Sequence, residues 1–577
     1  MTPPFDFKNP TDSFYVNNNV PNPTFISTWD IANGAKVFVT NNNGIVAQPG
    51  AYLKVGVSSV FDMGGKPFIL KSDATGTAAI GRTDGTILNA TNVTVERHMT
   101  ATRAWRIVAA PLAPTGAPTI LNSWQEGNAG GNPNSGYGTW ITSPYVGLGY
   151  DGPSVTASIK YWNGTAFDTI ANTSTTKVTD HGGVYYLFVR GDKSVTDYVT
   201  PPNSTVLRMK GTPNMGSMSN VGTVGTTNLT LVPNPYPSSI DYQAVYNGNP
   251  GAATSDIYVM DASLGSNGAF RTVTRVANNI YQTTPSGSNA DNVSSRYIRS
   301  GQAFFIPAQN TLNFTESMKI AVVPSFNIFK GTADDTTIQD LLVNMSIVDN
   351  NKDVLTDGVR IKFNKAYNKQ ADKEDVAKLE NPYENLSILN NGNNHVIDKR
   401  GLVTATETVQ LRMWNLAVNN YKFSFEPSYL NPGLSILLFD AYNNVTTVIS
   451  NTQSTTYTFA VDNQPGSYDP LRFKLQFVNG PLSVADKTQS SSIAIYPNPA
   501  TNRTIHLQYS DIKAGDYTIS LYNALGSPVY THAATLSSTG VSQLLLPASV
   551  ATGMYNLQIV DNKNQELIQS QKIIIAD

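Results

Sequence analysis

The stretch ETVQLRMWNLAVNNYKFSFEP, residues 407–427, decides the fold class of this chain. Two runs in it alternate apolar and polar side chains at nearly every second residue, and an asparagine pair between them is typical of a turn. A period of two places the apolar side chains on one face of a β-strand, so each run predicts a strand with one buried face. Strands of this kind bury that face against a second sheet, which favours a β-sandwich.

Other runs share the alternation. Around the first stretch they are GVRIKFN at 358–364, LSILLFDAYNN at 434–444, STTYTFAV at 454–461 and RFKLQFV at 472–478. Together they predict a β-sandwich domain over residues 330–478. An earlier set, including GVYYLFVRGD at 183–192 and SGQAFFIPAQ at 300–309, predicts another antiparallel sandwich over residues 94–329.

The first 93 residues are patterned differently. Brief β runs, such as AKVFVT at 35–40 and AYLKVGVSSVFDMGG at 51–65, alternate with turns rich in glycine and asparagine. No run is long enough to bury both of its faces alone, so stacking of successive turns is the economical arrangement. Residues 1–93 therefore predict a short β-solenoid, with an irregular β domain or rough sandwich as the alternative.

The composition suits an all-β chain of several domains. Its 577 residues include 43 Gly, 33 Pro and 28 Tyr, which favour many short strands joined by tight turns. Only NKQADKEDVAKL at 368–379, charged and short, predicts a helix. The fold class we expect is all-β: a string of β-sandwich or Ig-like domains behind the N-terminal solenoid.

Composition also excludes several classes of function. The absence of Cys excludes thiol nucleophiles, disulfides, zinc–thiolate sites and iron–sulfur clusters. A net charge of −2 with 14% charged residues gives no overall field that would attract nucleic acid or anionic lipid. No run approaches the roughly 18 apolar residues of a spanning helix. The opening residues lack the regions of a signal peptide, so for an exported protein we expect a mature form or part of a longer chain.

A separate module is predicted at the end of the chain. Residues 479–492, NGPLSVADKTQSSS, have little apolar pattern and predict a linker. Residues 493–577 contain several strand-like runs separated by Gly, Asn and Pro, such as DYTISLYNALGSPVY at 516–530 and GMYNLQIVD at 553–561. These runs predict a small Ig-like sandwich of about seven strands.

Four elements of this module occur in a set order. They are IYPNPATN at 495–502, the N-x-x-G turn of YTISLYNALGSPVY, the G-x-Y-x-L strand of GMYNLQIVD and the basic residue in QSQKIIIAD at 569–577. In this order they resemble the C-terminal (type A) sorting domain of type IX secretion cargo in Bacteroidetes, over about the last 85 residues. The signal residues that the resemblance marks are Tyr496, Pro497, Asn498, Pro499, Gly526, Gly553, Tyr555 and Lys572.

The resemblance implies partners and a location. In that family an outer-membrane shuttle and translocon bind the domain, a sortase-like peptidase cuts in the preceding linker, and the cargo is often attached to lipopolysaccharide. We expect the final strand, KIIIA at 572–576, to offer a free edge to a partner by β-augmentation. Upstream runs, such as RAWRIVAAP at 103–111, are similar to stretches of uncharacterised large cell-surface proteins, and that likeness implies no activity.

One acidic stretch is a candidate for calcium. Asp349, Asn351 and Asp353 begin like an EF-hand loop, but Val354 and Arg360 stand where its glycine and glutamate belong. These substitutions exclude an EF-hand and leave a looser calcium-stabilised loop as an alternative, with no other cofactor expected.

Other chemical motifs are weak. Gly147, Gly149 and Gly152 match G-x-G-x-x-G, but strand-like sequence follows where a dinucleotide site needs a helix. The five histidines are scattered, and no nucleophile elbow occurs. An enzyme would need carboxylates that converge in the fold. The sequence therefore favours a non-enzymatic surface protein of adhesin or stalk type.

The alternative is a carbohydrate-binding accessory region of a secreted polysaccharide-degrading protein. It predicts an exposed aromatic platform, for which Trp140, Tyr161 and Trp162 are the candidates. The tripeptide RGD at 190–192 is a known attachment motif, but its position favours a strand that ends in a turn.

Overall fold

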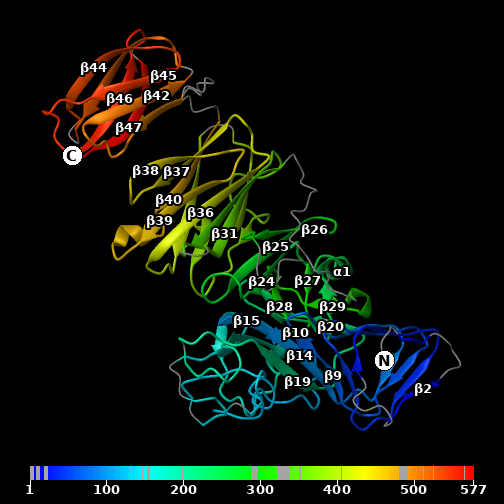
Figure 1. Ribbon diagram of the computed structural model, residues 1–577. Coiled ribbons are helices and arrows are strands. Elements are labelled where there is room, and N and C mark those ends of the chain that lie inside the picture. The colour runs from blue at the N-terminus through cyan, green and yellow to red at the C-terminus, as the bar shows by residue number, and fades with distance from the viewer. Residues whose placement is uncertain are drawn as a thin grey trace. The chain divides into compact units, whose positions relative to one another are not determined.

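The computed structural model describes residues 5–7, 13–17, 24–131, 133–145, 147–152, 156–197, 199–287, 296–320, 338–349, 353–403, 406–479, 492–510, 512–523, 526–564 and 566–576. The fold of these residues is of the all-β class, as predicted: strands dominate, and the α-helix that they contain is the short α1 (Tyr242–Gly248) (Figure 1). The chain divides into two compact units, Met1–Pro481 and Leu482–Asp577. Across the described ranges, no helix is long and apolar enough to cross a membrane.

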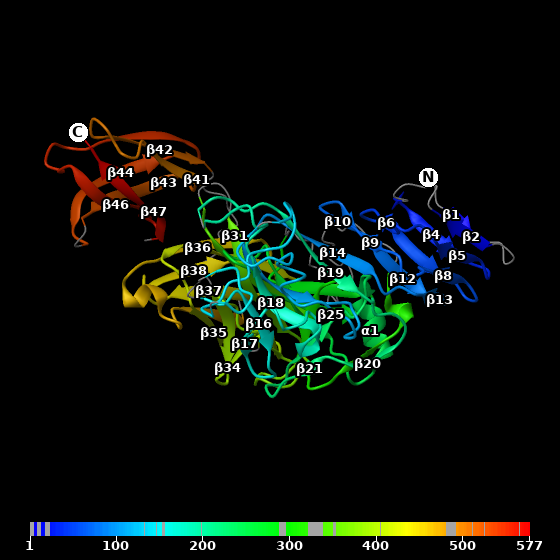
Figure 2. The same ribbon diagram turned by 90° about the horizontal axis from the view of Figure 1, so that it is seen from below.

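The N-terminal strands form a β-solenoid. Each short strand pairs in parallel with the equivalent strand of the next coil. The successive coils thus build three parallel sheets (Figure 2). The sheets are β1 (Phe5–Phe7), β4 (Thr28–Ile31), β7 (Tyr52–Val55) and β12 (Ala79–Thr83); β2 (Ser13–Val16), β5 (Lys36–Val39), β8 (Val60–Asp62) and β13 (Thr86–Leu88); and β3 (Thr24–Phe25), β6 (Ile45–Ala47), β9 (Phe68–Leu70) and β14 (Val93–Met99). Parallel stacking of consecutive coils is the arrangement of a solenoid and not of a sandwich.

Large apolar side chains fill the inside of the coil. Trp29 and Phe25 stack with ring centroids 4.4 Å apart, and Phe61 is fully buried beside them. The turn at Gly44 admits no side chain, because its φ is +69° and a Cβ atom would lie 1.7 Å from the carbonyl oxygen of Pro67. Burial of these rings and close coil-to-coil turns hold the solenoid together.

Strand β14 ends the coil and begins the antiparallel part of the chain. One of its edges pairs in parallel with β9, and its other edge pairs antiparallel with β19 (Thr205–Gly211). The carboxylate of Glu316 adds a second link, because it accepts hydrogen bonds from the backbone N–H groups of Thr83 and Gly216, at 2.9 and 2.6 Å. The last coil is therefore fastened to segments far along the chain.

Two antiparallel sheets follow and share a core. One has the order β15-β18-β16-β17 and the other β21-β22-β28-β24-β25-β26, and Ile107, Tyr258 and Phe305 lie buried between them. Their strands are β15 (Ala104–Ala109), β16 (Ile159–Trp162), β17 (Phe167–Thr169), β18 (Val184–Val189), β21 (Thr223–Val224), β22 (Thr230–Pro233), β24 (Asp256–Asp261), β25 (Ala269–Ala277), β26 (Ile280–Thr284) and β28 (Ala303–Ile306). Shorter elements are β10 (Ser72–Asp73), β11 (Gly76–Thr77), β20 (Met218–Val221), β23 (Ile240–Asp241), β27 (Tyr297–Ile298), β29 (Leu312–Phe314), η1 (His181–Gly183) and η2 (Glu316–Met318).

The stretch at 407–427 lies in a large sheet with the order β38-β37-β40-β35-β33-β34-β31-β30-β36-β39. A further short strand, β32, also pairs with β34. The two runs of the stretch form β35 and β36, and each buries the predicted alternate side chains, Leu411 and Phe423 among them, in one common core. The two strands do not pair with each other, since β35 lies between β33 and β40, and β36 between β30 and β39. The bounds are β30 (Gln339–Ile347), β31 (Val354–Phe363), β32 (Val376–Ala377), β33 (Asn385–Asn390), β34 (Asn393–Arg400), β35 (Glu407–Trp414), β36 (Asn419–Ser428), β37 (Leu434–Asp440), β38 (Val445–Ile449), β39 (Thr455–Val461), η3 (Pro465–Tyr468) and β40 (Phe473–Asn479).

The predicted helix at 368–379 is wrong. The segment forms turns and the short strand β32. Its acidic side chains bond to nearby backbone: Asp375 accepts from the N–H of Asp372, and Asp372 accepts from the N–H of Glu374, both at 2.8 Å. Such local bonds compete with helical hydrogen bonds and favour turns.

The described residues of the unit Leu482–Asp577 form a two-sheet sandwich of seven strands. One sheet has the order β41-β42-β45 and the other β44-β43-β46-β47, with a core of its own that includes Ile505, Leu521, Leu557 and Ile573. The strands are β41 (Ser492–Tyr496), β42 (Thr504–Ser510), β43 (Gly515–Tyr522), β44 (Pro528–Leu536), β45 (Gly540–Leu545), β46 (Gly553–Asp561) and β47 (Glu566–Ile575). The predicted linker at 479–492 lies, apart from its two end residues, outside the described residues. The predicted boundaries after residues 93, 329 and 478 stay predictions.

Candidate functional site

The Tyr-Pro-Asn-Pro turn at the head of the C-terminal sandwich fastens the last strand of the chain. The side chain of Asn498 donates to the carbonyl oxygen of Lys572 and accepts from the N–H of Ile574, both at 2.9 Å. The backbone N–H of Ala500 donates to the carbonyl of Ile574 at 2.7 Å, and the N–H of Ala576 donates back to Ala500 at 2.9 Å. We call these residues, Asn498 and Ala500 with 572–576, the terminal clasp.

The sequence of the turn explains the geometry. Pro497 and Pro499 carry no backbone N–H, so neither can extend the strand that ends at Tyr496. The polar contacts of the turn therefore come from the side chain of Asn498 and, one residue later, from the backbone of the fully buried Ala500. The peptide bonds before both prolines are cis.

The clasp corrects one expectation. The final strand was predicted to offer a free edge, but β47 pairs with β46 on one side, and Ala500 lies in a parallel bridge with Ile575 on the other. The end of the last strand is therefore paired on both edges. Sequence alone missed Ala500 because alanine after proline carries no chemical signal.

Other signal residues meet at the same strand. Gly553 opens β46 opposite Ile575, with φ +152°, and the exposed Lys572 lies opposite Asn556. Tyr555 pairs with Ile573, and its hydroxyl donates to the carbonyl of Ala551 at 2.9 Å. Gly553 and Tyr555 thus lie opposite residues of the clasp, to which Lys572 itself belongs.

Gly526 and Tyr496 serve other parts of the domain. Gly526 has φ +78° in the turn between β43 and β44, and its N–H donates to the carbonyl of Asn523 at 3.0 Å. The ring of Tyr496, 41% exposed, stacks on His506 at 5.6 Å. Neither residue takes part in the hydrogen bonds of the clasp that the structure describes.

The calcium loop predicted from Asp349, Asn351 and Asp353 lies in part outside the described residues. Asp353 contacts the Nζ of Lys422, and Asn351 lies outside the described residues. Among the residues that the structure describes, no group of three or more His, Asp or Glu side chains could hold a metal ion.

The candidate attachment and sugar-binding residues are engaged in the fold. Asp192 of the RGD tripeptide is buried and accepts from the N–H groups of Gly136 and Ser194. Trp162 is 7% exposed, and Tyr161 stacks on His181 at 3.8 Å. The indole N–H of Trp140 donates to the carbonyl of Val195 at 3.0 Å. These contacts give each residue a structural part in the fold.

Two family models match the chain. The model described as "Domain of unknown function (DUF8693)" matches residues 142–477, more than half of the chain, and "Secretion system C-terminal sorting domain" matches residues 494–576. The second match confirms the resemblance to type IX secretion cargo. The protein is therefore exported across the outer membrane to the cell surface or the extracellular space, and the sorting domain implies contact with the type IX machinery.

Comparison with other proteins adds no activity. Among solved structures, the crystal structure of Ruminococcus gnavus beta-glucuronidase is similar with 9% identity and a TM-score of 0.13. The match covers 35% of this chain and 46% of that chain, and at this TM-score it carries no argument. No curated protein matches the chain.

Proposed function

This chain belongs to the family of the Domain of unknown function (DUF8693), and from that premise we propose that it is a non-enzymatic surface protein of adhesin or stalk type. Its C-terminal domain is the signal for export and anchoring. In this proposal an outer-membrane shuttle and translocon bind the domain, a sortase-like peptidase cuts within 479–492, and the released cargo is attached to lipopolysaccharide.

The terminal clasp is the observation that carries the export part of the proposal. The domain is a compact unit with its own core, so it presents one folded surface to a receptor. Asn498 ties the head of the domain to its last strand, and Lys572 and Tyr555 belong to the same strand pair. A receptor that docks on this strand pair would meet several signal residues at once.

The buried carboxylates support a structural part for the upstream domains. Asp261 pairs with Arg271 at 2.8 Å and Asp440 with Arg472 at 2.7 Å, and all four side chains are at most 1% exposed. A general acid or base must reach its substrate, and carboxylates held in this way by buried cations do not. Trp140, Tyr161 and Trp162 are held by contacts within the fold and form no exposed aromatic platform. We therefore place the carbohydrate-binding accessory region second among the candidate functions.

A reporter fusion tests the export signal. Residues 479–577 are joined to a signal peptide and a fluorescent protein in a host with type IX secretion, and the surface and medium are assayed. Deletion of residues 572–577 should trap the reporter in the periplasm, and Asn498→Ala should lower export. Gln543→Ala, at an exposed glutamine of β45 in the other sheet, should export normally.

A stability control separates recognition from folding. Tyr517→Phe removes a hydrogen bond to the carbonyl of Lys513, away from the last strand, and should cost about as much stability as one bond of the clasp. Normal export of the deleted form would contradict the proposed signal. Tyr517→Phe removes one hydrogen bond and Asn498→Ala two, so export defects that follow the measured loss of stability in both variants would mean that only stability matters and not the clasp.

The adhesive part has a separate test. Host cells that export the full chain are compared with cells that export residues 479–577 alone, for attachment to surfaces coated with host or environmental polysaccharides. Attachment that depends on residues 1–481 supports an adhesin. Turnover of the coating by the purified chain would contradict the non-enzymatic part of the proposal.

A further inference from the structure

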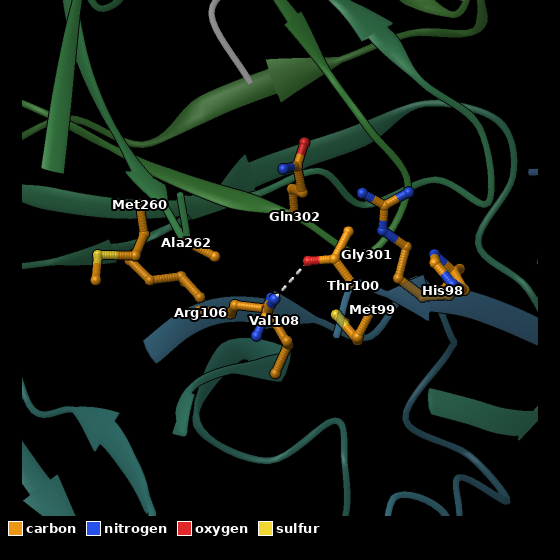
Figure 3. Close-up of a pocket in the computed structure, with 11 residues that line it drawn as sticks. His98, Met99, Thr100, Arg106, Val108, Met260, Ala262, Gly301 and Gln302 are labelled. Atoms are coloured by element: carbon orange, nitrogen blue, oxygen red, sulfur yellow. Dashed lines mark hydrogen bonds between the residues drawn. The ribbon is translucent and has the colours of Figure 1, made fainter. Parts of the chain in front are cut away.

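Buried basic side chains of the first unit are held in different ways. In the small pocket between β14, β15, β24 and the turn before β28, Arg106 donates hydrogen bonds to the hydroxyl of Thr100 and to the carbonyls of Thr102 and Ala104 (Figure 3). The charge of this arginine is thus answered within the fold. A buried lysine of the large sheet differs, because its described partner is a group with which an amine can react.

This lysine, Lys378, forms an ion pair with Asp357. The Nζ atom of Lys378 lies 2.7 Å from each of the two carboxylate oxygens of Asp357, and the side chains are 3% and 0% exposed. Lys378 directly follows β32, and Asp357 lies within β31, 21 residues earlier. Among the described residues, the amine of Lys378 donates to Asp357 alone. Because Nζ is equally distant from both oxygens, it faces the carboxyl carbon between them.

Backbone N–H groups hold the carboxyl group of Asp357 in this position. Its Oδ1 atom accepts from the N–H of Gly358 at 2.8 Å, and its Oδ2 atom accepts from the N–H of Leu386 in β33 at 2.7 Å. Donors placed in this way stabilise the negative charge that develops on a carboxyl oxygen when a nucleophile adds to the carbon. The pair therefore combines a nucleophile with a carboxyl group that is prepared for attack.

Burial favours the uncharged forms that amide formation needs. Burial raises the pKa of Asp357, and the attraction of Lys378 and the hydrogen bonds from backbone offset this effect only in part. Two charges without water around them lose their solvation, and transfer of one proton from Lys378 to Asp357 removes both charges. The result is a free amine, which is a nucleophile, beside a carboxylic acid.

A second carboxyl group, that of Glu384, lies beside the pair. Glu384 is 5% exposed and stands two residues before Leu386, whose N–H holds Asp357. Burial raises the pKa of Glu384, and the negative charge of Asp357 raises it further, so the two carboxyl groups are close enough for their charges to interact. A carboxyl group that is protonated near neutral pH can carry a proton between an attacking and a leaving group.

We propose that Lys378 and Asp357 become joined by an amide bond within the folded chain. The amine nitrogen bonds to the Cγ atom of Asp357, and the bond from Cγ to one carboxyl oxygen breaks. That oxygen leaves as water with its own proton and one proton from the amine, which Glu384 transfers. The reaction needs no oxidant and no further reactant. It does not depend on whether the chain is adhesive.

The bond fixes a joint between two sheets. The hydroxyl of Tyr258 donates to the carbonyl of Ala377, and the N–H of Phe270 donates to the side chain of Asn381, both at 2.7 Å. These contacts tie residues 377–381 to the sheet that contains β24 and β25, and the amide ties the same segment covalently to β31 of the large sheet. Tension along the chain then cannot pull this segment away from β31.

The mass of the purified full chain, measured under denaturing conditions, tests the proposal. We expect a mass that is lower than the mass of the sequence by one water molecule. After digestion with trypsin, residues 353–360 should appear joined to residues 374–399, because trypsin does not cut after an amidated lysine. The full mass of the sequence, with separate peptides, would overturn the proposal.

Variants separate the amide from another loss of water. Lys378→Arg keeps the positive charge but removes the reactive amine, so it should have its full mass. Lys54→Arg, at a lysine that pairs with Asp30 on the solenoid, should still lose one water molecule. Asp357 precedes Gly358, and an Asp-Gly pair can also lose water by closing a succinimide ring. A loss that persists in Lys378→Arg would identify this ring and overturn the amide. If a variant fails to fold, the joined peptide of the unchanged chain decides.

The part of Glu384 has a kinetic test. Glu384→Gln keeps the size of the side chain but cannot transfer a proton in the same way. The fraction of joined chain, followed by mass at successive times after synthesis, should then rise about a hundredfold more slowly. The unfolding midpoint of Glu384→Gln is compared with that of Lys378→Arg, which also lacks the bond, as the check on folding. An equal rate in the unchanged chain and in Glu384→Gln would overturn proton transfer by Glu384.

Discussion

Removal of the Asn498 side chain should loosen the end of the C-terminal domain by a measurable amount. Asn498→Ala deletes two hydrogen bonds of 2.9 Å, to the carbonyl of Lys572 and from the N–H of Ile574. Each such bond contributes roughly 0.5–1.5 kcal/mol net, so the free energy of unfolding should fall by about 1–3 kcal/mol. For a domain of this size that loss lowers the melting temperature by about 4 °C or more.

Denaturant unfolding of residues 482–577 measures this change, because the unit has its own core. The slope m should stay constant while the midpoint falls. Amide hydrogen exchange adds a local readout, since the N–H of Ile574 loses its acceptor and should exchange faster. The N–H of Asn556 should be unaffected.

Asn556→Ala is the matched control, because this exposed side chain accepts a hydrogen bond only from Ser570 among the contacts described for it, at 3.2 Å. If Asn498→Ala unfolds at the same midpoint as the control, and the exchange of Ile574 is unchanged, the clasp does not stabilise the last strand and the reasoning fails.

Three further predictions concern buried polar groups. Burial raises the pKa of Asp440, but hydrogen bonds from Arg472 and Tyr457 outweigh this effect and hold the pKa below its usual value. The ion pair of Asp440 with Arg472 therefore stabilises the fold fully above about pH 4, and this stabilisation is lost as the pH falls. Asp440→Asn should lower the free energy of unfolding by about 3 kcal/mol at pH 7 and flatten its acid dependence, as measured by denaturation of the full chain at several pH values. Burial lowers the pKa of Lys362 to about 8. Between about pH 8 and 10 the unfolded chain therefore binds more protons at this residue than the folded chain does, and the free energy of unfolding rises with pH. In Lys362→Met that rise should disappear from the same measurement. Tyr517→Phe should cost the C-terminal domain about 1 kcal/mol by denaturant unfolding, and an unchanged midpoint would contradict the part assigned to its hydroxyl.

The sequence predicted the features that depend on local pattern. Period-two alternation placed Leu411 and Phe423 in a buried core, where the structure has them, because alternate side chains of a strand always share a face. Short runs between turns predicted a solenoid or an irregular β domain, since such runs cannot bury both faces alone, and the parallel pairing of the coils decides for the solenoid. The order of four motifs was enough to identify the resemblance to a sorting domain, which the family comparison confirms.

Features that depend on pairing between distant segments were not predictable in this way. Alternation does not say which strands are neighbours, so nothing in residues 407–427 indicates that β35 and β36 pair with other strands. The bond between Asn498 and Lys572 joins the two ends of the domain. The helix predicted at 368–379 failed because Asp372 and Asp375 bond to backbone nearby, a competition that charge pattern does not show.

The pairing of β14 on both edges has a consequence for how the solenoid unravels. A free-standing array of coils can fray from either end, because each coil contacts only its neighbours. In this chain β19 and Glu316 hold the last coil, so loss of that coil would also break contacts with residues that follow much later. The last coil should therefore not open alone, but together with β19 and the turn at Glu316. Native-state hydrogen exchange would record this coupling as similar protection for the amides of β14 and β19.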